Sequence, residues 1–164
     1  MRIRPGTAAD VSLLAALIGE LAEFERLEGE VVMDEAALRR NLFGEHPYAE
    51  TLIAEEGGEA VGFGLFFHSF STFLGRPGVY LEDLFVRPAA RGRGAGSALL
   101  AALAGIALER GCGRLEWSVL DWNADAIGFY RKLGAAPNAG WTVYRMTGPA
   151  LAGLAARERH EEPR

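Results

Sequence analysis

The most informative part of the chain reads Val86-Arg87-Pro88-Ala89-Ala90-Arg91-Gly92-Arg93-Gly94-Ala95-Gly96-Ser97. An apolar, strand-like segment ends here, and a glycine-rich loop leads into a long apolar helix. Glycines let a backbone approach a ligand closely, and a helix N-terminus presents unpaired N–H groups with a partial positive charge. Arg91 and Arg93 add two formal positive charges. The segment therefore predicts a site for a phosphate or pyrophosphate group.

The spacing of the glycines excludes two common nucleotide-binding loops. A Walker loop needs a lysine directly before its serine or threonine, and Ser97 has none. Both registers of the dinucleotide fingerprint need a third glycine, where the chain has Ser97 or Leu99. The spacing that remains is Arg91-x-x-Gly94-x-Gly96. The alternative interpretation is a glycine-rich turn that binds no ligand.

Apolar periodicity predicts a single α/β domain over residues 1–164. Expected strands lie at Met1–Arg4, Thr51–Ala54, Val61–Phe67, Val79–Val86, Arg114–Leu120 and Trp141–Met146. Expected helices run from the capping residues Thr7 and Asp10 to Phe24, from Asp34 to Phe43, from Gly94 to Arg110, and from a cap at Asn123 to Gly134. We expect a loop from Phe70 to Gly78 and a frayed, charged tail from Ala155. This order of elements indicates one mixed sheet flanked by helices.

The composition disfavours several classes of protein. The 164 residues have a formal net charge of −5, and 49% of them are hydrophobic, which is typical of a globular protein rather than a disordered one. A non-specific nucleic-acid binder would usually be basic, so no nucleic-acid partner is expected. An acidic protein more readily attracts cations, including small amines. We expect no membrane span and no signal peptide, because no apolar stretch has the required length and setting.

Cysteine and histidine do not indicate a metal site. Cys112 is the only cysteine, which excludes an intrachain disulfide and favours a reduced, cytoplasmic protein. His46, His68 and His160 lack the spacing of metal ligands, so no metal cofactor is expected. A run of acidic residues stands out instead, with Arg26 as its only opposing charge: Glu20, Glu23, Glu25, Glu28, Glu30, Asp34 and Glu35. This run is either a solvated helix end and loop or a rim that attracts a cationic substrate.

Four separated motifs, in the same order, resemble a known enzyme family. They are Phe43-Gly44-Glu45-His46-Pro47, Tyr80-Leu81-Glu82-Asp83-Leu84-Phe85-Val86, the loop from Arg91 to Ser97, and the segment from Trp122-Asn123 to Phe129-Tyr130. Together they look like the diamine and thialysine N-acetyltransferase branch of the GNAT superfamily, which includes spermidine/spermine acetyltransferases. The run Leu120-Asp121-Trp122-Asn123 is closer to the thialysine-type members.

The resemblance implies a GNAT fold, a mixed and mostly antiparallel central sheet flanked by helices, and a homodimer. It also implies direct transfer of the acetyl group of acetyl-CoA to a primary amine, with no acyl-enzyme. By carry-over, the backbone of Leu84, Phe85 and Val86 pairs with the acetyl and pantetheine part of the cofactor. The pyrophosphate is held by Arg91, Gly92, Arg93, Gly94, Ala95, Gly96 and Ser97. Asn123 and Ala126, on the helix that Asn123 opens, flank the cofactor on the other side.

Acetyl transfer requires an amine that has lost its proton. An alkyl ammonium has a pKa of about 10.4, so deprotonation at pH 7 costs about 4.6 kcal/mol. Glu82 is our candidate base, acting through water, because it interrupts an apolar strand directly before the expected cofactor site. A structural salt bridge is the alternative role. Asp83 points to the opposite face if the strand is regular, although a bulge would change this.

The resemblance assigns roles to further residues. Tyr130 becomes the candidate general acid for the leaving thiolate, although packing alone would also explain a tyrosine there. The expected substrate contacts are Phe24, Glu25, Glu82, Asp83, Glu116 and Trp117. Two of them depart from polyamine enzymes: Phe24 replaces an aromatic hydroxyl often found near the substrate, and Glu116 replaces a different polar residue.

Three functions are compatible with these observations. The first is acetylation of a small cationic or zwitterionic amine such as a polyamine, a diamine or a thialysine-like molecule. The second is acetylation of a protein N-terminus or lysine. The third is a non-catalytic acyl-CoA-binding module, which the presence of both Glu82 and Tyr130 disfavours. The identity of the amine does not follow from the sequence.

Overall fold

The computed structural model describes residues 1–158 of the chain. The chain divides into two compact units, of which the first is Met1–Ser118 and the second begins at Val119. The expected sheet, the glycine loop and most of the candidate site residues belong to the first unit. Tyr130 and Asn123 belong to the second unit.

The first unit is built on a five-stranded sheet with the strand order β1-β2-β3-β4-β5. The strands are β1 (Arg2–Pro5), β2 (Glu50–Glu56), β3 (Glu59–Ser71), β4 (Arg76–Val86) and β5 (Leu115–Trp117). All neighbouring pairs are antiparallel except β4 and β5, which are parallel. The expectation of a mixed, mostly antiparallel sheet is confirmed.

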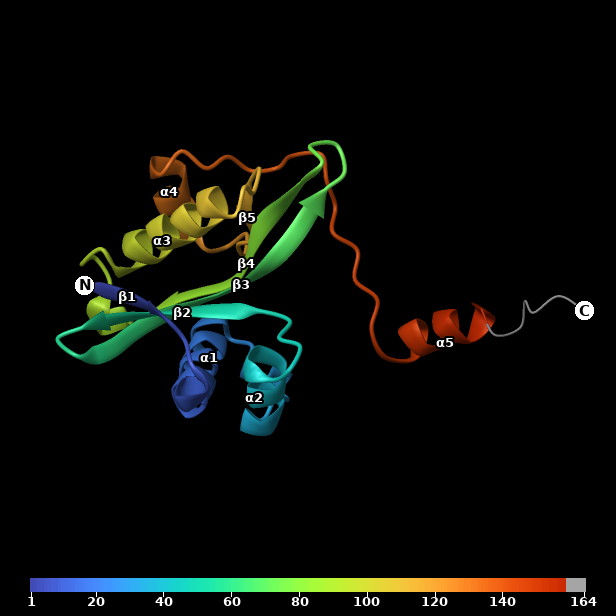
Figure 1. Cartoon of the computed structure of the whole chain (residues 1–164), viewed down its shortest axis with the longest axis horizontal. Helices are drawn as coiled ribbons and strands as arrows, with labels where there is room; N and C mark the ends of the chain where they lie inside the picture. The colour runs from blue at the N-terminus through green and yellow to red at the C-terminus, as the bar shows by residue number, and fades with distance from the viewer. Residues whose placement is uncertain (159–164) are drawn as a thin grey trace, which may run out of the picture. The chain divides into compact units, whose positions relative to one another are not determined.

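Helices cover both faces of this sheet. Figure 1 shows α1 (Val11–Glu25) and α2 (Glu35–Phe43) together on one side, and α3 (Ala95–Glu109) on the other. Short 3₁₀ helices lie at Ala8–Asp10, Glu28–Glu30 and Pro88–Ala90. The core beneath α1 and α2 includes Leu14, Leu17, Ile53, Phe63 and Phe85. Each large apolar side chain fully buried in such a core stabilises the fold by about 1.5–3 kcal/mol.

Side-chain caps set two of the helix starts that the sequence predicts. The Asp34 carboxylate accepts a hydrogen bond from the Ala37 N–H at 2.6 Å and begins α2. The Asn123 side chain accepts one from the Ala126 N–H at 3.1 Å and begins α4 (Ala124–Lys132). Both helices therefore begin where the capping residues indicate, because a cap needs only groups three positions apart.

A β-bulge interrupts the pairing of β3 with β4. Leu65 of β3 pairs with Asp83, whereas the next residue, Phe66, pairs with Leu81. Glu82 is therefore an extra residue on β4 with no partner of its own on β3. The expectation that Glu82 and Asp83 point to opposite faces assumes a regular strand, and β4 is not regular at these two residues.

The bulge changes which face of the sheet the following residues occupy. A Cβ atom added at Gly64 would lie 3.6 Å from Leu81 and 3.9 Å from Leu103, so Leu81 faces α3. Phe85, four residues later, packs with the leucines of α1 on the other face. A regular strand would place residues 81 and 85 on the same face. Leu65, which pairs with Asp83, packs against the core beneath α1. The bulge therefore directs Asp83 toward α1.

The expectation of a loop from Phe70 to Gly78 is wrong, because the strands of the β3–β4 hairpin extend through most of this segment. Phe70 pairs with Pro77 and Ser69 with Gly78, which leaves a turn of residues 72–75. A Cβ atom at Gly78 would lie 2.7 Å from the Ser69 hydroxyl oxygen. This glycine is required by close cross-strand packing and not by a turn, and sequence alone does not separate these two uses of glycine.

The expected strand at Trp141–Met146 is also wrong. Residues 141–147 have no regular secondary structure, and the second unit contains α4 and α5 (Gly148–Glu158) instead. A strand exists only where another strand satisfies its N–H and C=O groups, and none of the described residues does so here. In the first unit, β5 is likewise shorter than the expected Arg114–Leu120. The tail beyond Ala155 is helical to Glu158, and residues 159–164 lie outside the described part of the chain.

Candidate active site

The glycine loop has the geometry of an anion site. Gly92 and Gly94 have φ angles of +74° and +90°, a backbone conformation that other residues rarely adopt. No atom lies within 4 Å of a Cβ built at either position, so the space beside both glycines is open. The helix α3 begins at Ala95 immediately after them, and the first N–H groups of a helix have no partner within it. These residues fit a phosphate-bearing cofactor.

The two arginines of the loop differ in what they contact. Arg93 forms an ion pair with Glu56 at 2.8 Å and donates to the carbonyl oxygen of Ala89 at 3.2 Å. Arg91 instead donates from Nε to the carbonyl oxygen of Val86 at 2.9 Å, and its guanidinium lies 4.3 Å from the centre of the Phe24 ring. Arg93 is thus held at the β2–β3 side, whereas Arg91 is turned toward α1.

The C-terminal end of β4 has an open edge on its β5 side. The parallel pairing with β5 ends at Leu81 and Trp117, while β4 continues to Val86. On its other edge β4 remains paired with β3 as far as Val86. The backbone of Leu84–Val86 therefore has no neighbouring strand on the β5 side within the first unit. This is the backbone that the sequence predicts to pair with the pantetheine arm.

Three carboxylates lie close together at the bulge. Burial of Asp83, together with the charges of Glu82 and Glu25, raises the pKa of its carboxyl to about 6. Burial also raises the pKa of Glu25, the last residue of α1. Glu82 itself is exposed. Within residues 1–158 no lysine or arginine forms an ion pair with any of the three, so the cluster suits a cationic ligand.

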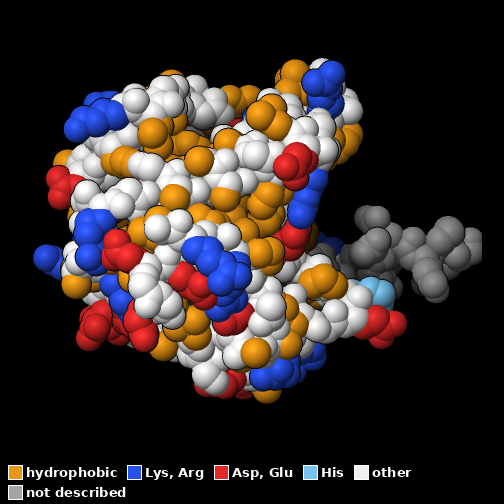
Figure 2. All heavy atoms as spheres, turned by 60° about the vertical axis from the view of Figure 1, so that its left-hand side comes forward, with side chains coloured by type: hydrophobic (Ala, Val, Ile, Leu, Met, Phe, Trp, Pro, Cys, Tyr) orange, Lys and Arg blue, Asp and Glu red, His pale blue; other side chains and the backbone are white. Residues whose placement is uncertain are grey.

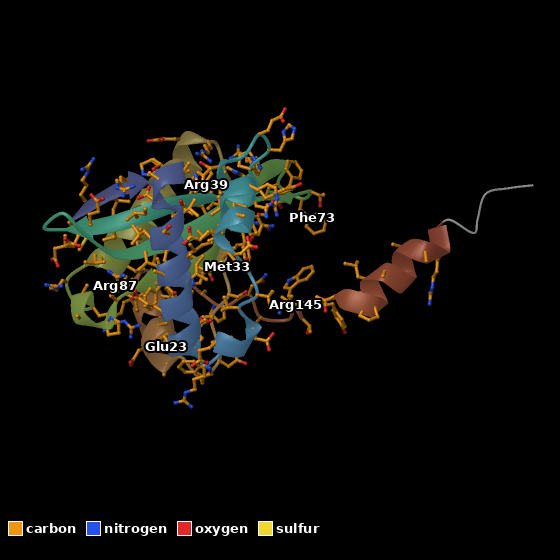
Figure 3. All side chains as sticks on the ribbon, turned by 90° about the horizontal axis from the view of Figure 1, so that it is seen from below. Glu23, Met33, Arg39, Phe73, Arg87 and Arg145 are labelled. Atoms are coloured by element: carbon orange, nitrogen blue, oxygen red, sulfur yellow. The ribbon has the colours of Figure 1, made fainter. Side chains whose placement is uncertain are left out.

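A hollow of about 330 Å³ lies beside this cluster and is lined by Glu20, Glu23, Phe24, Phe85 and Pro88. Arg87 holds Glu20 through contacts of 2.6–3.1 Å. Figure 3 shows Glu23 and Arg87 beside the same end of α1. On the face drawn in Figure 2, acidic and basic side chains lie next to one another rather than in separate fields. Specific pairing therefore decides which acidic groups remain available to a ligand.

The sequence profile of the acetyltransferase (GNAT) family matches residues 15–135, which is more than half of the chain and includes the glycine loop and the acidic cluster. The chain belongs to the GNAT acetyltransferase family. It is an acyltransferase, and enzymes of this family use acetyl-CoA as their acetyl donor.

Several known proteins are similar to this acetyltransferase over most of their length. Mouse (Mus musculus) thialysine N-epsilon-acetyltransferase is 40% identical, with 95% of this chain and 98% of the relative covered. L-ornithine N5-acetyltransferase NATA1 of Arabidopsis thaliana is 32% identical, with 92% and 86% covered. Among solved structures, the integron cassette protein VCH_CASS6 of V. cholerae matches with a TM-score of 0.79 at 30% identity and covers 94% of this chain and 96% of its own.

The remaining expected substrate contacts of the acetyltransferase lie on β5. Arg114 forms an ion pair with Glu116 at 2.7 Å, so this carboxylate already has a cationic partner. Trp117 pairs with Leu81 and so shares the α3 face of the sheet with it, whereas Glu116 pairs with Tyr80. The Tyr80 hydroxyl lies 2.8 Å from the Ser118 hydroxyl. Of the expected acidic contacts, Glu25, Glu82 and Asp83 form one cluster and Glu116 belongs to a separate ion pair.

The candidate acid of the acetyltransferase lies in the second unit. Tyr130 is half-buried on α4, and its ring centre is 5.4 Å from that of Phe129. Asn123 uses its side-chain oxygen to cap the same helix. The meeting of Tyr130 with Glu82, which belongs to the first unit, stays a prediction.

Two contacts of the acetyltransferase site were not predicted. Arg87, which pairs with Glu20, directly follows β4, and Pro88, which lines the hollow, begins the 3₁₀ helix after it. No local pattern distinguishes them from loop residues, because their partners are distant in sequence. Within residues 1–158 there is no cluster of three metal-binding side chains, and His160 lies outside this range. None of the described helices has the length and apolar character needed to cross a membrane.

Proposed function

We propose that this acetyltransferase transfers the acetyl group of acetyl-CoA to the primary amine of a small cationic or zwitterionic molecule, such as a polyamine, a diamine or a thialysine-like amino acid. The observation behind this proposal is the acidic cluster of Glu25, Glu82 and Asp83, which lies beside the open edge of β4 and contains no cationic side chain. A cation bound there would stabilise the charged form of carboxylates that burial and mutual repulsion otherwise disfavour.

The relatives support the same class of substrate. One is named for thialysine and another for L-ornithine, which are amino acids with an amine at the end of the side chain. Both substrates combine positive charge with a reactive primary amine. The acidic cluster fits such molecules better than neutral or anionic ones.

The proposed cofactor contacts follow the geometry of the first unit. The backbone from Gly92 to Ser97 and the N-terminus of α3 would hold the pyrophosphate, with Arg91 and Arg93 adding charge. The open edge of Leu84–Val86 would pair with the pantetheine arm. Asn123 and Ala126 would flank the cofactor. Bound acetyl-CoA supplies an acetyl group already activated as a thioester.

Two residues are proposed to move protons. Glu82 accepts the proton of the substrate ammonium through a water molecule and so supplies the acceptor for a deprotonation that costs about 4.6 kcal/mol at pH 7. Asp83 and Glu25 attract the ammonium and hold it near Glu82. The Tyr130 hydroxyl donates a proton to the departing sulfur atom. The resemblance to the diamine and thialysine branch supports these roles.

Three broader proposals accompany this activity. The family match at residues 15–135 runs through the boundary at Ser118, which supports one functional acetyltransferase domain made from both units. A homodimer is proposed from the same resemblance. A cytoplasmic location is proposed because Cys112, the only cysteine, is free.

The test is a screen of the purified protein with acetyl-CoA against thialysine, lysine, ornithine, putrescine, spermidine and a basic peptide, with thiol release as the readout. Release with at least one of the small amines supports the proposal. Release with the peptide alone would transfer the assignment to protein acetylation. Binding of coenzyme A without release for any acceptor would favour a non-catalytic acyl-CoA-binding module.

A further inference from the structure

The side chain of Arg91 contacts both the backbone proposed for the cofactor and Phe24, which we expect from the sequence to contact the amine. Its Nε donates to the carbonyl oxygen of Val86, which belongs to the backbone proposed for the pantetheine arm. Its guanidinium lies over the ring of Phe24, which lines the hollow beside the acidic cluster. One exposed side chain therefore links the cofactor site to the amine site.

The carbonyl of Val86 faces the open edge of β4. The N–H of Arg87 donates to the carbonyl oxygen of Val61 on β3 at 2.9 Å. Because the polar groups of successive strand residues point to opposite edges, the carbonyl of Val86 points away from β3. This carbonyl is therefore directed to the edge where a pantetheine amide would bind, and Arg91 occupies it.

The ring of Phe24 already serves as a cation site. A guanidinium 4.3 Å from the ring centre is in the range of a cation–π contact. The surroundings suit positive charge, because Glu23 lines the same hollow and Glu25 follows Phe24 in the chain. An alkyl ammonium would be attracted to this ring face for the same reasons as Arg91. The two cations cannot occupy it together.

We propose that Arg91 is an internal occupant of the cation subsite at Phe24 and leaves it when acetyl-CoA binds. The cofactor takes the Val86 carbonyl, and its pyrophosphate draws the guanidinium toward the loop from Gly92 to Ser97. The Phe24 ring then accepts a positive group of the amine. The consequence is that bound cofactor raises the affinity of the enzyme for the amine. This inference rests on the proposed function, since it assumes an amine substrate.

The test uses calorimetry to measure the binding of two amine probes, spermidine and thialysine. Each probe is titrated into the free enzyme and into the complex of the enzyme with coenzyme A. Coenzyme A carries no acetyl group, so no transfer can occur during the measurement. A cation–π contact and one hydrogen bond together correspond to about a tenfold effect on the binding constant. For the wild type we expect at least one probe to bind about tenfold more tightly to the complex than to the free enzyme. By reciprocity, coenzyme A affinity must rise by the same factor when that amine is present.

Two loop variants separate this proposal from a general effect of charge. Arg91→Gln frees the ring, so the free variant should bind the amine about as tightly as the wild-type complex does. Arg93→Gln removes the same charge from the same loop, but Arg93 contacts Glu56 and Ala89 instead. It should keep the wild-type difference between free enzyme and complex. A thermal melt verifies that both variants are folded.

Several results would overturn the proposal. Equal amine affinity of free wild type and free Arg91→Gln would show that Arg91 does not compete with the amine. An increase of the same size in Arg93→Gln would show that net charge alone is responsible. Thiol release in the amine screen together with either result would reject this inference and leave the proposed function intact. Absence of amine binding to every form, with no thiol release, would reject both.

Discussion

At the scale of single residues, the bulge on β4 gives two neighbouring carboxylates different surroundings. Glu82 is the extra residue of the bulge and is exposed to solvent. Asp83 is partly buried toward α1, near Glu25, and its pKa is raised to about 6. The roles proposed for the two residues can therefore be tested separately: proton exchange with water for Glu82 and binding of positive charge for Asp83.

Glu82→Gln tests the proton-accepting role. The substitution keeps the size of the side chain but removes the base, so kcat at pH 7 should fall by about 10²-fold or more. Activity should recover partly toward pH 10, because more of the free amine loses its proton without help. The measurement is kcat and KM from pH 6 to 10, beside a thermal melt. An unchanged pH profile would remove Glu82 from the mechanism, and lower stability with that unchanged profile would indicate a structural salt bridge.

Asp83→Asn tests the surroundings of Asp83 through stability. The folded carboxyl, with a pKa of about 6, binds its proton more tightly than the unfolded one, whose ordinary value is 3.8. Unfolding free energy therefore falls as pH rises from about 4 to about 6, by about 1–3 kcal/mol. Asp83→Asn removes this loss, so its melting temperature relative to wild type should be higher at pH 7 than at pH 4.

Asp10→Asn provides a comparison of opposite sign. Arg4 holds Asp10 through two hydrogen bonds of 2.8 Å and keeps its pKa well below the usual range. This pair contributes its stability fully above pH 4 and loses it only in strong acid. Asp10→Asn should therefore destabilise the protein by a similar amount throughout pH 4 to 8. A constant offset for Asp83→Asn over the same range would contradict the raised pKa of Asp83.

At the scale of elements, the junction of β4 with α3 combines an open strand edge, two left-handed glycines and a helix N-terminus. All three features lie within the dozen residues that follow the neighbouring carboxylates Glu82 and Asp83. The glycine loop and the acidic cluster are therefore connected by one short segment of chain. The position of Arg91 over the ring of Phe24 shows that this segment also contacts α1.

Gly94→Val tests the loop. A β-branched side chain is strained at φ +90° and would crowd the site of the pyrophosphate, so coenzyme A affinity should fall by at least about tenfold. Gly58→Val is the matched control, because Gly58 has φ +89°, has equally open surroundings and lies in the β2–β3 turn. Both variants should lose similar stability, by about 1–3 kcal/mol. Equal coenzyme A affinity of the two variants, measured by calorimetry, would remove the loop from the cofactor site.

At the scale of the whole molecule, the proposed mechanism uses residues from both units. The glycine loop and the acidic cluster belong to Met1–Ser118, whereas the candidate acid Tyr130 lies beyond Val119. The proposed proton donation by Tyr130 therefore requires both units to contribute to the reaction. Kinetics can detect this requirement without any structural probe.

Tyr130→Phe tests that requirement. If the hydroxyl protonates the leaving sulfur, kcat should fall by about 10²-fold while KM for acetyl-CoA changes much less. Tyr144→Phe makes the same chemical change at a side chain that is 92% exposed, and it should leave kcat unchanged. The measurement is steady-state kinetics of both variants with the best amine of the screen. Activity of Tyr130→Phe within twofold of wild type would assign Tyr130 to packing.

The local features of this protein were predictable from its sequence. The caps at Asp34 and Asn123, the glycine loop before α3 and the order of elements in the first unit agree with the sequence-based expectations. These features depend on groups a few positions apart, or on backbone angles that few residues can adopt. The acid pair was also visible, because two charges interrupt an apolar strand.

Only the tertiary structure decided which groups meet. The bulge at Glu82 arises from the pairing of β4 with β3, and it turns Asp83 toward Glu25 of α1. The length of the β3–β4 hairpin and the absence of a strand at Trp141–Met146 depend in the same way on which strands find partners. The contact of Arg91 with Phe24 joins residues far apart in the chain. Such long-range contacts produce no periodic pattern in a sequence, because they depend on how the strands of the whole sheet pair and how the helices pack against it.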